Sequence, residues 1–160
     1  MNLPVKPDEW FKDGLRFECT GCGNCCTGGP GYVWVTKEET QRLADFLKLT
    51  PVEVERQYSR KIDGMVSLKE KRPNARGEYD CIFLKEVPAE SPSQKTKRMC
   101  TVYAVRPLQC RTWPFWNGNL ASPEAWKAAG KRCPGVNAGR TWTRAEMLSR
   151  RDATQWPAEE

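Results

Sequence analysis

The pattern of hydrophobic and polar positions predicts a first helix over residues 37–48. Within TKEETQRLADFLK, apolar Leu43 and Leu47 recur at helical spacing among charged neighbours. Thr36, the first residue of this stretch, stands directly before the predicted helix, and Glu39 follows Thr36 at the spacing of a capping box. We therefore expect an amphipathic helix that begins just after Thr36.

Similar signals predict three further helices. In TPVE, a threonine N-cap, a first-turn proline and a box glutamate mark the start of the second helix. SPE opens the third helix, which Gly130 can close, and TRAE opens the fourth. The predicted limits of these helices are 51–60, 122–130 and 143–151.

Short runs of β-branched and aromatic residues predict strands at 32–35, 65–70 and 79–85. A KRPNARG turn separates the last two. The polar segment 86–98 contains two prolines and is typical of a loop.

Together these elements predict the α+β class: a small single domain of short strands and several short helices, organised around a cysteine-rich metal centre. We expect this domain to cover residues 17–151. Residues 1–16 form a polar lead-in that offers Phe11 for packing, and residues 152–160, which end in WPAEE, form a tail.

The composition is that of a globular protein outside the membrane. The chain has 160 residues, of which 39% are hydrophobic and 29% are charged. No apolar run reaches the length of a membrane span or of a secretory signal. We therefore expect a cytoplasmic protein with no membrane partner.

The absence of histidine removes several classes of site. Without it the chain cannot form a Ser-His-Asp triad, a Cys-His nucleophile or an HExxH metalloprotease site. The net charge is +6, and several arginines and lysines stand beside cysteines. These basic residues can offset the negative charge of thiolates. A nucleic-acid-binding surface is the less favoured explanation of the excess positive charge.

Eight cysteines are the main candidates for chemistry. They are Cys19, Cys22, Cys25, Cys26, Cys81, Cys100, Cys110 and Cys133. A disulfide scaffold is disfavoured, because no export signal is visible and CTGCGNCC crowds thiols where unstrained partners are scarce. Metal binding explains the spacing better, since Gly21 and Gly23 let closely spaced cysteines turn toward one centre.

The spacing leaves the metal open between zinc and an iron–sulfur cluster. Zinc sites usually contain two separated C-x-x-C pairs. A C-x-x-C-x-x-C run with a distant cysteine before proline is instead typical of bacterial ferredoxins, and Cys133-Pro134 supplies that distant ligand. Both metals therefore remain candidate cofactors.

The eight thiols can form one centre or two. Neighbouring side chains of extended backbone point to opposite sides, so Cys25 and Cys26 are expected to serve different centres. One set would then be Cys19, Cys22, Cys25 and Cys133, and the other Cys26, Cys81, Cys100 and Cys110. A single centre with spare structural or reactive thiols is the alternative.

Four segments of the chain resemble a known family. FECTGCGNCC, CIFL, CTVYAVRPLQCRTWPF and CPG together are similar to the CxxCxxCC cysteine-cluster family, the YkgJ-type zinc- or iron-chelating domain. The resemblance runs from Phe17 to Gly135 and implies metal binding, with a structural or redox role. A related domain in flagellin lysine N-methylase makes a cluster-dependent protein-modifying enzyme an alternative, and a nucleic-acid or protein interaction module is another.

Within the matching motif, Arg106 and Arg111 flank Cys110. We expect them to donate N–H groups to sulfur ligands or to neutralise their charge. Surface salt bridges are the alternative explanation for both arginines. No particular protein or redox partner is indicated.

Overall fold

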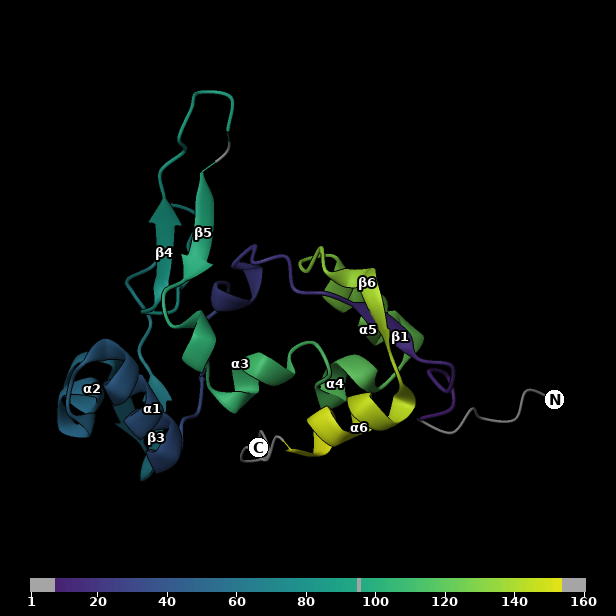
Figure 1. The fold of residues 1–160 in the computed structure, drawn as a ribbon, viewed down its shortest axis with the longest axis horizontal. Helices are drawn as coiled ribbons and strands as arrows, with labels where there is room; N and C mark the ends of the chain where they lie inside the picture. Colours follow the sequence, from purple (N-terminus) through teal and green to yellow (C-terminus); the bar gives the residue numbers. More distant parts are fainter. Residues whose placement is uncertain (1–7, 95, 154–160) are drawn as a thin grey trace. The chain divides into compact units, whose positions relative to one another are not determined.

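The computed structural model describes residues 8–94 and 96–153 (Figure 1). Its contacts divide the chain into two compact units. The terminal unit consists of Met1–Thr20 with Thr112–Glu160, and the central unit is Gly21–Arg111. Each unit has its own buried core.

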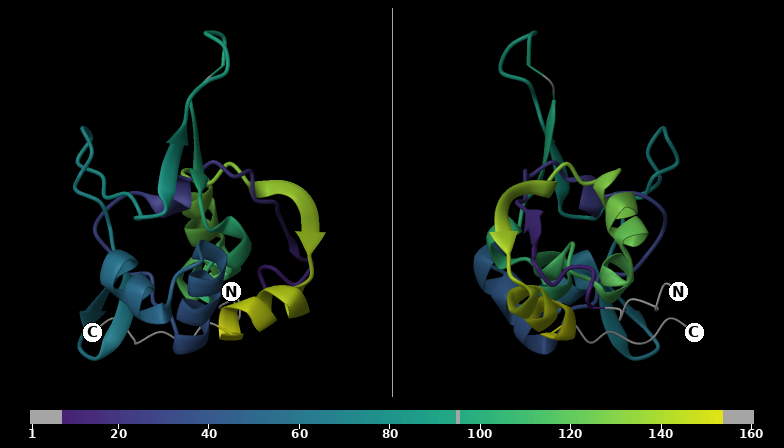
Figure 2. Two further views of the ribbon diagram at one scale, coloured as in Figure 1. Left: turned by 60° about the vertical axis from the view of Figure 1, so that its left-hand side comes forward. Right: turned by 90° about the vertical axis from the view of Figure 1, so that its right-hand side faces the viewer.

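The terminal unit joins the two ends of the described chain through a pair of strands. Strand β1 (Leu15–Phe17) runs antiparallel to β6 (Val136–Trp142), as the views in Figures 1 and 2 show. The helices of this unit are α4 (Asn117–Leu120), α5 (Pro123–Gly130) and α6 (Arg144–Ala153). The buried core contains Phe11, Phe17, Phe115, Leu120, Trp126, Val136 and Met147.

The central unit begins its regular structure with a helix pair. Helix α1 (Lys37–Leu47) and helix α2 (Pro51–Tyr58) both start at threonine N-caps with complete capping boxes. These boxes satisfy backbone N–H groups that have no partner inside a helix. Both predicted helices are therefore confirmed, although α2 ends at Tyr58 because Ser59 begins a strand.

Two hairpins follow the helix pair. Strand β2 (Ser59–Ile62) pairs with β3 (Met65–Leu68), and β4 (Leu84–Val87) pairs with β5 (Lys97–Cys100). Each pair is antiparallel. The remaining elements are the 3-10 helices η1 (Asn24–Cys26) and η2 (Tyr103–Val105) and helix α3 (Leu108–Thr112).

The predicted strands are correct only in part. Residues 32–35 do not form a strand; they make an isolated bridge from Trp34 to Ser67 beside β3. Most of the predicted strand 79–85 is also absent, and a bridge between Glu70 and Cys81 holds that segment against residues 69–71. The predicted loop 86–98 is wrong at both ends, where β4 finishes and β5 begins.

The remaining helix predictions are confirmed by α5 and α6. The mixed α+β class with short strands and short helices is confirmed as well. The domain limits 17–151 stay a prediction. Of the predicted lead-in and tail, residues 1–7 and 154–160 lie outside the described residues.

The core of the central unit is mainly aliphatic. It consists of Val35, Leu43, Ala44, Val54, Leu68, Phe83 and Val102. Cys81 and Cys100 are partly buried and pack against this core. The cysteines therefore extend the edge of a hydrophobic cluster.

Candidate metal centre

Within the central unit, five of its six cysteines lie close to one another. The Sγ atoms of Cys25 and Cys26 lie 4.0 Å apart. The Cys26 thiol also forms a hydrogen bond with Cys100. Cys81 and Cys110 lie close enough for the charges of Cys25 and Cys100 to raise their pKa values. These five residues form the thiol cluster.

The 3-10 helix η1 brings Cys25 and Cys26 together. Successive side chains of a 3-10 helix are about one third of a turn apart, not on opposite sides as in a strand. The extended backbone expected at Cys25 and Cys26 is therefore wrong, and whether the two serve one centre or two stays a prediction. Arg98 Nη2 donates a hydrogen bond to Asn24 Oδ1 at 2.7 Å, which fixes the start of η1.

Glycine is required at the start of η1. Gly23 has a φ of +74°, in the left-handed region that favours glycine. A Cβ atom at this position would lie 2.9 Å from Leu84 Cδ1 and 3.2 Å from Arg98 Cβ. The glycine therefore lets the CTGCGNCC loop approach the β4–β5 hairpin.

Backbone hydrogen bonds connect three members of the cluster. The Cys81 N–H donates to Cys26 O at 2.7 Å, so these two residues are held side by side. The Leu84 N–H donates to Cys81 O at 2.9 Å and turns the chain into β4. Within the β4–β5 pair, Leu84 lies directly opposite Cys100.

Helix α3 carries Cys110 and is anchored on both sides. The Leu108 N–H donates to the buried carboxylate of Glu39 at 2.6 Å. The side-chain oxygen of Gln109 accepts the Trp34 N–H at 2.9 Å. These contacts link the Cys110 segment to α1 and to the segment that contains Trp34.

The thiols of the cluster bind protons unequally. Hydrogen bonding with the Cys26 thiol lowers the pKa of Cys25 and that of Cys100 to about 7. The same two hydrogen bonds raise the pKa of Cys26. Burial raises the pKa of Cys81 to about 11 and also raises that of Cys110. Near neutral pH, Cys25 and Cys100 therefore carry a substantial fraction of thiolate, the form that binds metals.

Arg106 places a positive charge beside the cluster. Its charge favours the thiolate forms of Cys25 and Cys100, as a smaller effect than the hydrogen bonds from Cys26. The guanidinium lies 3.7 Å from the centre of the Tyr103 ring, and Nε donates to Tyr103 O at 3.0 Å. Arg111 Nε donates to Arg106 O at 3.0 Å, so Arg111 contacts the backbone of its neighbour.

The other three cysteines lie outside the thiol cluster. Cys22 belongs to the central unit and accepts a backbone N–H at 3.4 Å. Cys19 is exposed and belongs to the terminal unit. Cys133 belongs to that unit too, where its Sγ accepts the indole N–H of Trp113 at 3.5 Å. The predicted set of Cys19, Cys22, Cys25 and Cys133 is thus divided between the two units.

The chemistry of the thiol cluster fits a thiophilic metal. Thiolates are the preferred ligands of structural zinc and of iron–sulfur clusters. Two thiolates on one tetrahedral zinc lie roughly 3.8 Å apart, given Zn–S bonds of about 2.3 Å. The Cys25–Cys26 separation of 4.0 Å is close to this value. Across residues 8–94 and 96–153, no group of three or more cysteine or acidic side chains is arranged so that it could hold a metal ion.

Lys71 is a neighbour of the cluster that the sequence did not reveal. Its charge favours the thiolate form of Cys81, and its Nζ donates a hydrogen bond to Leu84 O. Lys71 stands ten positions before Cys81 in the chain. The antiparallel pairing of residues 69–71 with 80–82 brings the two together, and the KRPNARG turn between the strands predicted there was the signal that could have identified it.

Comparison with known proteins defines the family. The model of the CxxCxxCC family, described as a "Putative zinc- or iron-chelating domain", matches residues 18–134. The chain therefore belongs to the CxxCxxCC family, a family of metal-binding domains. The match covers the thiol cluster and all eight cysteines.

The chain is also similar to an uncharacterized protein of Methanocaldococcus jannaschii. The two are 35% identical over 115 residues, which cover 71% of this chain and 52% of the relative. The chain thus matches about half the length of that relative. No solved structure matches it. Among the described residues, no helix is both long and apolar enough to cross a membrane.

Proposed function

We propose that the thiol cluster binds zinc or iron and that the bound metal stabilises the central unit. The convergence of five cysteines from four separate segments, in a chain without histidine, is the observation that carries this proposal. A metal bound by thiolates from distant segments would cross-link the 3-10 turn, the 80–82 segment, β5 and α3. Its binding free energy would then contribute directly to folding.

Four thiolates would complete a tetrahedral zinc site, and the fifth would remain a spare thiol or join a second metal. The proposed ligands are Cys25, Cys26, Cys81, Cys100 and Cys110. Arg106 would offset the charge of the ligands, and Arg111 would hold the Arg106 backbone in place. Cys19, Cys22 and Cys133 remain predicted metal ligands.

An iron–sulfur centre with a redox role is the second candidate. It is favoured by the C-x-x-C-x-x-C spacing and by the exposure of Cys25, because an exposed ligand allows electrons to reach a cluster. The proposal of metal binding holds for either metal. The colour and sulfide content of the protein distinguish them.

The experiment that tests the proposal is purification without oxygen, followed by measurement of zinc, iron and acid-labile sulfide per chain. A colourless protein with stoichiometric zinc would establish the structural site. A brown protein with iron and sulfide would establish the second candidate. A reduced, fully folded protein without either metal would contradict both.

Two matched substitutions locate the centre. Cys100→Ser removes a cluster thiol, and Cys133→Ser makes the same chemical change in the terminal unit. We expect Cys100→Ser to lose most of the bound metal. If Cys133→Ser keeps the full amount, one centre suffices; if it loses about half, a second centre exists. Full metal in Cys100→Ser would place the site elsewhere.

A further inference from the structure

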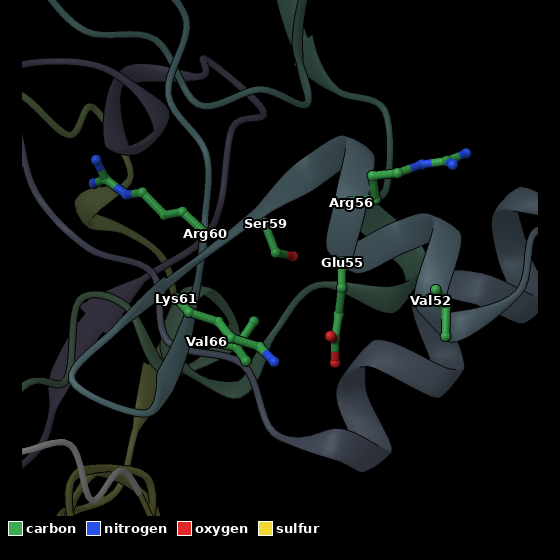
Figure 3. A pocket seen from close by; sticks show the side chains of 7 residues that line it. All are labelled: Val52, Glu55, Arg56, Ser59, Arg60, Lys61 and Val66. Atoms are coloured by element: carbon green, nitrogen blue, oxygen red, sulfur yellow. The ribbon is translucent and has the colours of Figure 1, made fainter.

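A pocket of about 360 Å³ lies in the central unit, where α2 meets the β2–β3 hairpin (Figure 3). Its volume falls in the range of small-molecule sites. None of its lining residues is a cysteine, so it is chemically separate from the thiol cluster. Its walls combine two valines, Val52 and Val66, with charged and hydroxyl side chains.

The Ser59 hydroxyl is the first sign that this pocket receives a polar ligand. Ser59 is only 5% exposed, and among the residues that the structure describes its Oγ has no hydrogen-bonding partner. Ser59 also lines the pocket. A buried polar group without a partner costs free energy, which a ligand that bonds to it would recover.

Two opposite charges stand beside this hydroxyl without pairing. In Figure 3 the side chains of Glu55 and Lys61 reach into the space near Ser59, and both residues line the pocket. No ion pair between them exists within the described part of the chain. An arrangement of one carboxylate, one ammonium group and one hydroxyl is complementary to a ligand that itself carries both charges.

The two arginines of the lining are positively charged, but their guanidinium groups extend away from Ser59 in Figure 3. Arg60 Nη2 donates to Gly31 O at 2.8 Å, and its guanidinium lies 5.2 Å from the centre of the Tyr32 ring. The Arg56 side chain extends away from the pocket in Figure 3. Lys61 is therefore the cation that faces the same space as Glu55 and Ser59.

The end of α2 adds a preference for a cationic group. Helix α2 ends at Tyr58, and the carboxyl end of a helix carries a partial negative charge. Glu55 belongs to that last turn. Lys69 Nζ already donates to Arg56 O at 2.6 Å, which shows that this helix end accepts an ammonium group. Glu55 and this helix end therefore favour a ligand that carries an ammonium group.

We propose that this pocket binds a small zwitterion of the α-amino acid type with an apolar side chain. The ligand ammonium group would bond to Glu55, and its carboxylate to Lys61 and the Ser59 hydroxyl. The apolar side chain would contact Val52 and Val66. The proposal is independent of the metal centre, because it uses no residue of the thiol cluster.

The test is isothermal titration of the full-length protein as purified with L-leucine, L-leucinamide and N-acetyl-L-leucine. Leucinamide lacks the carboxylate, and N-acetyl-leucine lacks the ammonium group. We expect leucine to bind and each derivative to bind about tenfold more weakly or worse, since each loses a charge-assisted hydrogen bond.

Three substitutions assign the contacts. Ser59→Ala is expected to weaken leucine binding several-fold. Glu55→Gln is expected to abolish the preference for leucine over N-acetyl-leucine, and Lys61→Met the preference over leucinamide. Lys85→Met and Glu86→Gln make the same chemical changes on β4, outside the pocket, and are expected to leave binding unchanged. Circular dichroism and metal content confirm that each variant is folded.

Three outcomes would overturn the proposal. No binding of leucine by the folded protein would remove the ligand class. Equal binding of leucine and N-acetyl-leucine would show a site for simple anions. Unchanged binding by Ser59→Ala together with increased stability would show that the hydroxyl is merely unpaired in the core.

Discussion

The terminal unit and the central unit bury similar numbers of side chains, but of different kinds. In the terminal unit, four of the seven core residues are aromatic, and rings such as Phe115 and Trp126 stack 5.9 Å apart. In the central unit, Phe83 is the one aromatic residue among the seven, and Cys81 and Cys100 pack at the edge. Large rings bury more apolar area than valine, alanine or cysteine.

Hydrogen bonds from tryptophan side chains also connect distant segments of the terminal unit. Their indole N–H groups donate over long sequence distances, from Trp10 to Leu120 O at 3.0 Å and from Trp142 to Phe17 O at 2.9 Å. The central unit instead concentrates thiols where short elements meet. The difference indicates that aromatic packing stabilises the terminal unit, and we propose that a metal bound by the thiols stabilises the central unit.

Phe115→Ala is expected to give the largest effect on the terminal unit. Phe115 is 1% exposed and contacts the rings of Phe17, Trp126 and Trp142. Removing a buried ring lowers the free energy of unfolding by about 3–5 kcal/mol. Urea unfolding followed by tryptophan fluorescence measures it, because tryptophans 10, 113, 116, 126 and 142 all belong to this unit.

Phe83→Ala is the matched variant in the central unit. Phe83 is 3% exposed, stacks on Tyr58 at 4.8 Å and accepts the Thr101 N–H beside Cys100. We expect this variant to lose bound metal and Phe115→Ala to keep it. Equal metal loss in both variants would contradict the separation of roles.

Arg106→Gln is expected to have an intermediate effect, on the metal and not on the terminal unit. Removing its charge from beside Cys25 and Cys100 should weaken metal binding roughly 10–100-fold, as is common for residues that support metal ligands. Competition with a chromophoric chelator measures the affinity. Arg106→Lys keeps the charge and should keep most of the affinity. Equal losses in both variants would attribute the effect to stacking on Tyr103.

The capping boxes should give the smallest effect, as a dependence of stability on pH. The Thr143 N–H donates to Glu146 at 2.8 Å and lowers the pKa of this carboxyl below its ordinary value of 4.5. The corresponding hydrogen bond from Thr50 lowers the pKa of Glu53. A carboxyl with a lowered folded-state pKa stabilises the fold above its unfolded-state pKa, and this contribution is lost as the pH falls through the folded value.

Glu146→Gln should therefore flatten the stability of the terminal unit between pH 6 and 3, as measured by urea unfolding. Glu53→Gln is the matched change in the central unit. There the effect should be hidden, because protonation of the thiolates releases the metal over the same range. A clear flattening for Glu53→Gln alone would contradict the dependence of the central unit on its thiols.

The sequence predicted the elements whose signals are local. Capping boxes at Thr36 and Thr50 specify the starts of α1 and α2 within a few residues of chain. It did not predict β1 and β6, because Leu15 and Trp142 are far apart in the chain and β1 is only three residues long. Pairing of this kind depends on tertiary contacts and not on a pattern within either segment.

The same limit applies to the thiol cluster. The spacing of CTGCGNCC indicates metal binding, since it depends only on residues that are close in the chain. Which cysteines lie near Cys26 depends on the hydrogen bond from the Cys81 N–H and on the hairpin that carries Cys100. The extended backbone assumed for Cys25 and Cys26 is wrong, because the chain forms η1 there; their assignment to one centre or two stays a prediction.

Hydrogen exchange of the metal-loaded protein, compared with the same protein after reduction and chelation, tests the central claim most directly. The account predicts that α3, β4 and β5 in the central unit lose most of their protection, while β1, β6 and α6 in the terminal unit keep theirs. Unchanged protection throughout the central unit of a protein shown to be free of metal would contradict it.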